Sequence, residues 1–149
     1  MRAVVQRVSR GQVRCGEEVV GAIDRGLVVL VGAATDDGED DARALVDKLV
    51  GLRVFPDEAG QMNRAVGEVG GALLLVSQFT LLGDARKGRR PSFVAAMAPG
   101  PAEALYDRVV ERARATGLPV ATGRFRADMQ VELVNDGPVT LLLDTKKLF

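Results

Sequence analysis

The sequence contains no histidine, no tryptophan and a single cysteine, and aromatic residues make up only 4% of it. The lack of histidine excludes Ser-His-Asp and Cys-His catalysis in their usual forms, and it also excludes zinc sites built from imidazole. One cysteine excludes a disulfide framework and a thiolate metal cluster. So few aromatic rings argue against a surface that stacks many bases.

The chain also lacks a net charge and a long apolar run. Its 20 basic and 20 acidic side chains cancel, whereas a protein that coats nucleic acid is far more basic. The longest strongly apolar run, residues 27–34, is far shorter than the ~20 residues of a membrane-spanning helix. The N-terminal arginines are interleaved with valines and no continuous apolar stretch follows them, unlike a secretory signal. We therefore expect a cytoplasmic protein without membrane association.

The 149 residues suit a single domain that spans 1–149. Segments rich in β-branched or apolar residues are separated by turn-prone residues, which predicts short strands joined by tight turns. These segments are 3–8, 12–14, 19–23, 27–31, 52–55, 72–76, 129–134 and 139–143. Two further stretches, 42–50 and 102–113, carry apolar residues at helical spacing. The expected fold class is α+β, a β-rich single domain with mostly antiparallel or mixed sheets and about two packed helices.

A first candidate for function follows the buried strand at 72–76. It consists of Ser77, Gln78, Phe79 and Thr80. Hydroxyls and an amide supply hydrogen bonds but no base that titrates near neutral pH. The segment either faces a cleft or is the start of a loop.

Two other candidates are a basic loop and a turn-like segment. The basic loop contains Arg86, Lys87, Arg89 and Arg90. It is either a solvated surface or a contact with RNA phosphates. Residues 135–140 are interpreted as a hairpin connection between two strands. Proline between paired strands removes a backbone donor, however, so this bend is also expected to leave carbonyls exposed.

An acidic run precedes the first expected helix. It includes Asp36, Asp37, Glu39 and Asp40. Acidic side chains at this position cap a helix and complement its dipole. A metal site is the alternative, because carboxylates bind hard cations.

Five motifs, taken in order and with their spacing, resemble the D-aminoacyl-tRNA deacylase family. They are Ser77-Gln78-Phe79-Thr80-Leu81, Gly88-Arg89-Arg90-Pro91-Ser92-Phe93, Ala102-Glu103-Ala104-Leu105-Tyr106-Asp107, Thr122-Gly123-Arg124-Phe125 with Ala127-Asp128-Met129-Gln130-Val131, and Val134-Asn135-Asp136-Gly137-Pro138-Val139-Thr140. The segment 3–8 is similar to the first strand of that family. The resemblance covers the whole chain except the last few residues.

The resemblance implies the family's fold and its reaction, hydrolysis of the ester between a D-amino acid and the 3′ end of tRNA. It also implies activity on glycyl-tRNA, in which glycine is mischarged on tRNA-Ala, and hence a proofreading role in translation. The expected partners are these aminoacyl-tRNAs and a second copy of the chain, in a homodimer with active sites at the subunit interface. No cofactor and no metal are expected.

The family's functional residues map onto this sequence one by one. Ser77, Gln78, Phe79 and Thr80 would form the catalytic floor of the pocket. Gly137 and Pro138 would be the family's Gly-cisPro dipeptide, which reaches into the partner's pocket, and Arg7 would hold it in place. Phe125 and Met129 would help to enclose the terminal adenosine, and the Arg86–Arg90 loop is a candidate for phosphate contact. Two carbonyls fixed near the substrate Cα would clash with an L side chain, accept a D one and let glycine pass.

Two mechanisms stay open without a histidine base. In the favoured one, the 2′-OH of the terminal adenosine helps to activate water, while Gln78, Phe79 and Thr80 bind the developing oxyanion. In the other, Thr80 is a nucleophile, which needs a nearby base that the sequence does not reveal.

Two other functions are also considered. A non-catalytic nucleic-acid-binding homodimer would depend on the Arg86–Arg90 loop and be indifferent to Gly137→Ala. A metallohydrolase that uses the acidic run would be inhibited by chelators.

Overall fold

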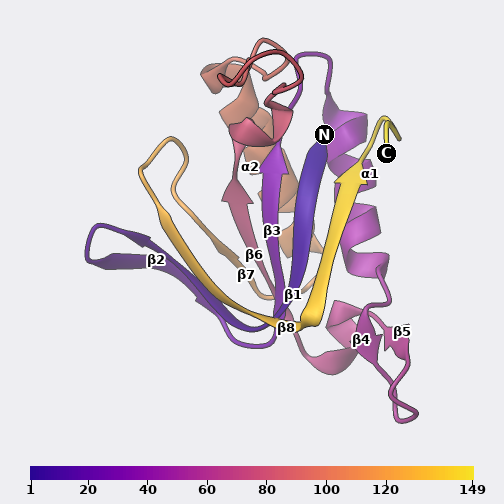
Figure 1. The fold of residues 1–149 in the computed structure, drawn as a ribbon. Helices are drawn as coiled ribbons and strands as arrows, with labels where there is room; N and C mark the ends of the chain where they lie inside the picture. The colour runs from indigo at the N-terminus through magenta and orange to yellow at the C-terminus, as the bar shows by residue number, and fades with distance from the viewer.

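The computed structural model describes residues 1–149 and is built around a mixed six-stranded sheet (Figure 1). The long strand β1 (Arg2–Cys15) pairs antiparallel with three other strands. Its first half pairs with β3 (Gly26–Gly32), its second half with β2 (Glu18–Ile23), and both halves pair with β8 (Gln130–Asp144) on the opposite side. Beyond β3 the sheet continues in parallel through β6 (Ala72–Ser77) and β7 (Val120–Thr122). The predicted fold class is confirmed.

β1 is one strand where the sequence predicts two, at 3–8 and 12–14. Gly11, one of the turn-prone residues between these two predicted segments, lies inside the ladder opposite Ile23 and Leu133. A Cβ on Gly11 would lie 2.7 Å from Cγ2 of Val28. The glycine therefore permits close packing within the sheet rather than a turn.

β8 is likewise continuous, so the interpretation of residues 135–140 as a hairpin connection is wrong. Asn135 pairs with Val8 and Thr140 pairs with Gln6, and the register shifts between them. The Asn135 side chain bridges this irregularity, because its Oδ1 accepts the Val139 N–H at 3.1 Å and its Nδ2 donates to Thr140 Oγ1 at 3.0 Å. These side-chain bonds replace ladder bonds and keep both parts of β8 on the same neighbour.

Two helices, α1 (Glu39–Gly51) and α2 (Pro99–Ala115), pack against each other and cover one face of the sheet (Figure 1). The larger hydrophobic core lies between them and the strands. Its fully buried members include Val5, Leu27, Val29, Leu73 and Leu75 from the sheet and Leu45, Leu49 and Val109 from the helices. Both helices were expected from their apolar periodicity, and both are confirmed.

The opposite face of the sheet has a smaller core, formed by Val8, Val13, Ile23, Val28, Leu74 and Val76. It is covered by the curved outer part of the sheet itself, because β2 bends back towards β7. The approach is so close that a Cβ on Gly21 would lie 2.3 Å from the Thr122 carbonyl oxygen. The curvature thus encloses a second layer of side chains without a further helix.

The short elements complete the chain. β4 (Phe55–Pro56) and β5 (Met62–Arg64) form a small hairpin, and η1 (Val66–Val69) and η2 (Phe79–Leu82) are 3₁₀ helices. The strand expected at 52–55 overlaps β4 only at Phe55, and neither β5 nor β7 was predicted. None of the helices combines the length and apolar character that crossing a membrane requires.

Candidate active site

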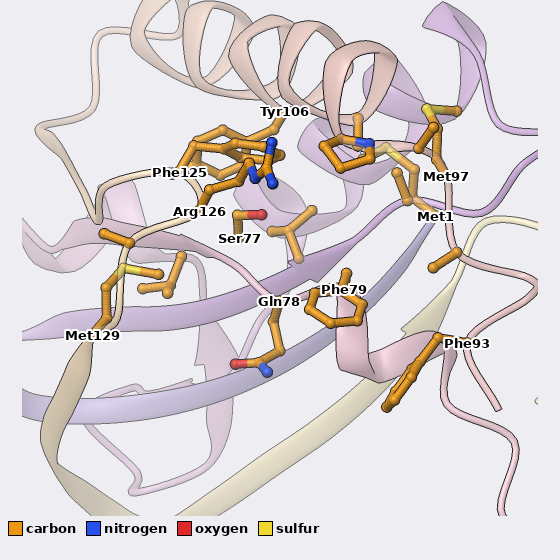
Figure 2. Close-up of a pocket in the computed structure, with 18 of the residues that line it drawn as sticks. Met1, Ser77, Gln78, Phe79, Phe93, Met97, Tyr106, Phe125, Arg126 and Met129 are labelled. Atoms are coloured by element: carbon orange, nitrogen blue, oxygen red, sulfur yellow. The ribbon is translucent and has the colours of Figure 1, made fainter. Parts of the chain in front are cut away.

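A cavity of about 640 Å³ opens where β6 ends, bounded by the start of α2 and by the segment between β7 and β8 (Figure 2). Three of the four predicted catalytic residues, Ser77, Gln78 and Phe79, line it. Both predicted substrate-binding residues, Phe125 and Met129, line it as well. The structure therefore brings five predicted site residues from two separate motifs to one place.

The end of β6 positions the floor of this cavity. Leu73, Leu74 and Leu75 are fully buried, and Ser77 is the first residue of the strand's end to be partly exposed. In Figure 2, Ser77 points into the space below Phe125. The Gln78 N–H donates to the Val31 carbonyl at 2.7 Å, which extends the contact between β3 and β6 by one residue.

Phe79 and Phe93 form an aromatic pair at the rim of the cavity. Their ring centroids are 5.1 Å apart in an edge-to-face arrangement, which is a preferred geometry for aromatic rings. Phe79 is nevertheless 55% exposed. The rim therefore presents an exposed aromatic ring to an incoming ligand.

Tyr106 and Phe125 form the wall opposite Ser77, with ring centroids 6.1 Å apart. The Tyr106 hydroxyl donates to the Leu75 carbonyl at 2.8 Å, and the Gly123 N–H donates to the same oxygen at 3.0 Å. Burial raises the pKa of Tyr106 far above its usual value, and the nearby Asp107 carboxylate adds to the effect. The hydroxyl therefore stays protonated and acts as a hydrogen-bond donor that ties α2 to β6.

Tyr106 belongs to the stretch 102–113, whose helical spacing predicts that it packs in the core; it is indeed buried there, but it also lines the cavity. Its helical spacing signals burial and does not reveal that second surface. Arg126 and Met1, which also line the cavity, were not predicted at all. Nothing in a single sequence distinguishes Arg126 from the other surface arginines.

Thr80 does not line the cavity. It lies in η2, is exposed, and its hydroxyl receives a hydrogen bond from the Gln78 side-chain amide. No titratable side chain forms a hydrogen bond with that hydroxyl in the structure. The arrangement therefore gives Thr80 no base to activate it as a nucleophile.

Gly137 and Pro138 lie apart from the cavity of their own chain. Both are exposed, and the peptide bond between them is cis. Arg7 donates from Nε to the Asp136 carbonyl at 3.0 Å and from Nη1 to the Val54 carbonyl at 2.6 Å. Arg7 thus connects the residue before this dipeptide to the segment that precedes β4.

The basic loop is exposed and is closed at its base by backbone bonds between Asp84 and Ser92, of 2.8 and 2.9 Å. Hydrogen bonds from the Arg86 side chain and backbone N–H lower the pKa of Asp84 to about 2. Arg86 is thereby paired, with its Nη2 2.6 Å from an Asp84 oxygen. Lys87, Arg89 and Arg90 have no acidic partner and leave a local positive charge on the surface.

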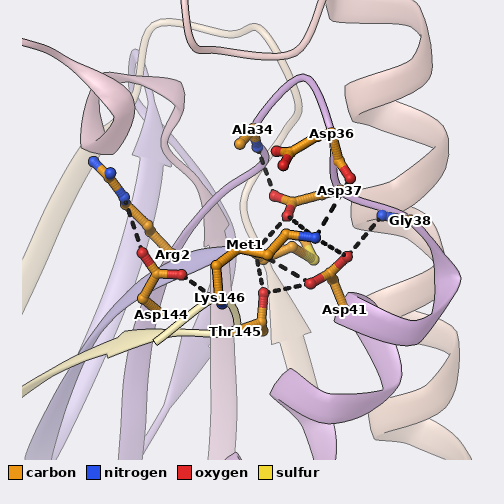
Figure 3. A network of polar contacts seen from close by, with 10 residues as sticks. All are labelled: Met1, Arg2, Ala34, Asp36, Asp37, Gly38, Asp41, Asp144, Thr145 and Lys146. Atoms are coloured by element: carbon orange, nitrogen blue, oxygen red, sulfur yellow. Dashed lines mark hydrogen bonds and ion pairs between the residues drawn. The ribbon is translucent and has the colours of Figure 1, made fainter. Parts of the chain in front are cut away.

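The acidic run is used in a buried ion pair as well as in the helix cap (Figure 3). The α-ammonium of Met1 lies 2.8 Å from Asp37 Oδ1, with neither group exposed. Asp37 also accepts the Ala34 N–H at 2.7 Å. The cap itself comes from Asp41, whose carboxylate accepts the Gly38 N–H at 3.0 Å. Because the Met1 side chain lines the cavity, this network also fixes part of the cavity wall.

Lys146 and Thr145 join the same network from the C-terminal segment. Lys146 Nζ lies 3.1 Å from an Asp41 oxygen, and the Thr145 hydroxyl donates to Asp41 at 2.6 Å. Burial raises the pKa of Asp41, but the hydrogen bonds from Thr145, Gly38 and Lys146 outweigh it and lower the pKa to about 2. Asp40 pairs with Arg43 instead, at 2.8 Å. No three acidic or cysteine side chains of the structure are arranged to hold a metal ion.

Comparison with known proteins places this chain in a family. The sequence model of the D-Tyr-tRNA(Tyr) deacylase family matches residues 4–144. The chain belongs to this family. The match includes the cavity residues of β6, the segment between β7 and β8, and the Gly137–Pro138 dipeptide.

Curated members of the family are similar over their full length. A D-aminoacyl-tRNA deacylase of Anaeromyxobacter dehalogenans is 66% identical over 149 residues, which are all of both chains. One of Thermotoga petrophila is 58% identical over 149 residues, again with complete coverage of both. The family resemblance expected from the five motifs is therefore confirmed.

Two solved structures share the fold. One described as the c-Myc DNA unwinding element binding protein is 42% identical and superposes with a TM-score of 0.91, covering 97% of this chain and 99% of that one. Another, described as a probable eukaryotic D-amino acid tRNA deacylase, has a TM-score of 0.83 over 95% of this chain and 97% of that one. At 20% identity, this second likeness shows the fold alone.

Proposed function

We propose that this member of the deacylase family hydrolyses the ester of D-aminoacyl-tRNA, which frees the D-amino acid and tRNA. The observation that carries the proposal is the cavity at the end of β6, where Ser77, Gln78 and Phe79 meet Phe125 and Met129. Its apolar wall suits a nucleoside, and its polar floor suits an ester. The whole chain would act as one domain, because the family match extends over residues 4–144, and its cytoplasmic location stays a prediction.

The terminal adenosine is proposed to bind between Phe125 and Met129, with the ester over Ser77. Aromatic and thioether side chains bind a base through apolar contact and stacking. The cavity of about 640 Å³ lies in the range of small-molecule sites. This orientation leaves the rim at Phe79 and Phe93 for the substrate's remaining parts.

Hydrolysis is proposed to depend on positioning and on the substrate's own 2′-OH, which helps to activate water. The Gln78 N–H is already donated to Val31, so it is unavailable to a developing oxyanion. The N–H groups of Phe79 and Thr80 begin η2 and have no preceding turn to donate to. Of these two residues only Phe79 lines the cavity, so the Phe79 N–H and the Ser77 hydroxyl are the proposed oxyanion donors.

Thr80 as the nucleophile is the less favoured route, because its hydroxyl is bound by the Gln78 amide and lies off the cavity lining. Thr80→Ala is therefore expected to keep near-normal turnover in single-turnover assays. A trapped ester on Thr80 would contradict this mechanism.

Gly137 and Pro138 are proposed to act as a chiral filter in the cavity of a second copy, in a homodimer. Their exposure and their separation from their own cavity support action on a partner. Carbonyls fixed beside the substrate Cα reject an L side chain by overlap, whereas glycine has no Cβ to reject. The same filter would therefore pass glycyl-tRNA, including glycine mischarged on tRNA-Ala.

The test is the release of amino acid from matched D-aminoacyl-, L-aminoacyl- and glycyl-tRNA in the presence of a chelator. Rapid loss of the D and glycyl esters, with the L ester spared, is the expected result. Equal hydrolysis of D and L esters would overturn the filter but not the hydrolase. No hydrolysis by a folded protein would overturn the proposed reaction.

Binding of nucleic acid without catalysis is the second candidate function. It is favoured by Lys87, Arg89 and Arg90, which lack acidic partners, and by the likeness to a solved structure described as a DNA unwinding element binding protein. A binder is expected to lose affinity when these cations are replaced by alanine and to be indifferent to Gly137→Ala. A deacylase is expected to be sensitive to Gly137→Ala.

A further inference from the structure

Arg126 is the only residue with a charged side chain among those that line the cavity. In Figure 2 its guanidinium lies beside Phe125, above the space that Ser77 faces. It has no acidic partner, whereas Arg124 in the same segment pairs with Glu18 at 3.2 Å. The cavity therefore contains one uncompensated positive charge in an otherwise neutral lining.

The backbone of Arg126 is also unusual. Its φ is +62°, in the left-handed region that residues other than glycine rarely adopt. Only one other non-glycine residue of the chain, Lys147, has a positive φ. An exposed arginine that lines a cavity and holds a disfavoured backbone conformation is an observation that supports a functional hypothesis.

The positive charge of Arg126 restricts which part of the substrate can bind next to it. This step rests on the proposed function. The aminoacyl end of the substrate carries an α-ammonium, which Arg126 would repel, and the base, ribose and ester are neutral. The nearest negative charge is the phosphate that joins the terminal nucleotide to the preceding one, and a guanidinium fork fits phosphate oxygens well.

We propose that Arg126 binds the phosphate on the 5′ side of the terminal nucleotide. This contact orients the nucleotide in the cavity, with its phosphate under Arg126 and its ester over Ser77. It also requires a nucleotide rather than a free nucleoside for full affinity. Arg126 is thus a substrate-binding residue that determines how the acceptor end enters.

The experiment compares Arg126→Gly with wild type on two substrates, D-aminoacyl-tRNA and the D-aminoacyl ester of adenosine, which lacks the phosphate. For the tRNA substrate, KM is expected to rise about tenfold, the size of one lost charged hydrogen bond, with kcat unchanged. The slope of log KM against log salt concentration is expected to decrease by about 0.7, the value for one phosphate contact on a single strand. For the adenosine ester, neither KM nor kcat is expected to change.

Two further variants complete the design. Arg124→Ala removes a neighbouring arginine that is already paired with Glu18 and does not line the cavity, and it should leave both substrates unaffected. Arg126→Lys keeps the positive charge but loses the paired N–H donors of the guanidinium. Its affinity for tRNA should therefore lie between those of Arg126→Gly and wild type. Glycine accepts a positive φ freely, so Arg126→Gly is expected to melt no lower than wild type.

The outcomes separate this inference from the proposed reaction. An equal change on both substrates, or no change on either, would overturn the phosphate contact while leaving the hydrolase intact. If wild type hydrolyses neither ester, the proposed reaction fails, and the contact is then tested by titration with 5′-AMP and adenosine. A preference for 5′-AMP that disappears in Arg126→Gly would support the contact, and equal affinities in wild type would overturn it.

Discussion

At the scale of single residues, the cavity wall depends on one carbonyl oxygen. Leu75 O accepts hydrogen bonds from both Tyr106 and Gly123, so it aligns β6 with α2 and with the segment after β7. Tyr106→Phe removes the first bond, keeps the ring in place and leaves the carbonyl bonded to Gly123. We expect the free energy of unfolding to decrease by about 1 kcal/mol, as measured by urea denaturation. An unchanged stability would show that this hydroxyl contributes nothing to the wall.

Gly137 is the residue whose replacement should affect function most directly. Its φ is +129°, and a Cβ there would lie 2.8 Å from Arg7 Nη2 and 3.0 Å from Val139 Cγ2. Gly137→Ala must therefore displace Arg7, which holds the Asp136 carbonyl. We expect loss of most D-ester hydrolysis, measured as release of the D-amino acid from tRNA.

Gly60→Ala is the matched control for Gly137→Ala. Gly60 also has a positive φ, of +78°, but a Cβ there would meet nothing within 4 Å. It is expected to cost about 1 kcal/mol of stability and to leave hydrolysis intact. If both variants lose activity equally, backbone strain in general is responsible, and not the position of Gly137.

Site residues that stand in a sequence motif could be predicted, whereas a residue whose role arises only from the fold could not. Ser77, Gln78, Phe79, Phe125 and Met129 stand in motifs, and the cavity brings them together. Arg126 stands beside one of these motifs, but its role comes from a positive φ and from the lack of an acidic partner. Both properties arise only when the chain is folded, so no composition or spacing could reveal them.

At the scale of secondary-structure elements, the acidic turn before α1 holds the N-terminal strand in place. The Asp37 side chain is fully buried against the Met1 ammonium, and its removal leaves that buried charge with only the more distant Asp41 carboxylate, 3.9 Å away. Asp37→Ala is expected to lower the free energy of unfolding by roughly 3–5 kcal/mol. Its exposed neighbour Asp36 supplies the control, because Asp36→Ala should change stability by no more than about 0.5 kcal/mol. Similar losses in both variants would show that the turn matters only through its total charge.

The first turn of α1, which follows, is expected to make stability depend on pH through Asp41. Its pKa is about 2 in the native state against 3.8 without the fold. The ionised carboxylate therefore stabilises the protein at any pH above about 4, and this contribution is lost as the pH falls through the native pKa. After allowance for screening by solvent, we expect a loss of about 1 kcal/mol between pH 4 and pH 2. Urea denaturation across this range should show a steeper slope in wild type than in Asp41→Asn, which keeps only the contribution of other carboxylates with a lowered pKa, such as Asp84.

Helices and strands could be predicted where apolar residues recur at a regular spacing. α1 and α2 each carry apolar residues at helical spacing over several turns, so both helices were expected from the sequence. The sequence predicts two strands in place of β1 and two in place of β8, because glycine and proline usually end a strand. In the fold, Gly11 instead allows contact with Val28, and the Asn135 side chain bridges the irregularity before Val139. Long-range packing thus overrode the local signal in both strands.

At the scale of the whole molecule, β8 leaves one long edge uncovered. It extends over 15 residues and pairs only with β1. Leu142 and Val134 on this strand are 62% and 41% exposed, although unpaired strand edges usually carry protection. A second copy of the chain that covers part of this surface would also bring Gly137 and Pro138, which lie on the same strand, to a neighbouring molecule.

Mixing two inactive variants tests whether each active site combines two subunits. Ser77→Phe fills the cavity but keeps residues 137–138, whereas Gly137→Ala keeps the cavity but displaces the dipeptide. In a mixed dimer, the intact cavity of one subunit meets the intact dipeptide of the other, so one of its two sites is whole. Equal co-expression should therefore restore about a quarter of the wild-type sites, as expected for random pairing in a two-fold dimer. If each chain instead completes its own site, the mixture will stay as inactive as the separate variants, and the filter must then act within one subunit.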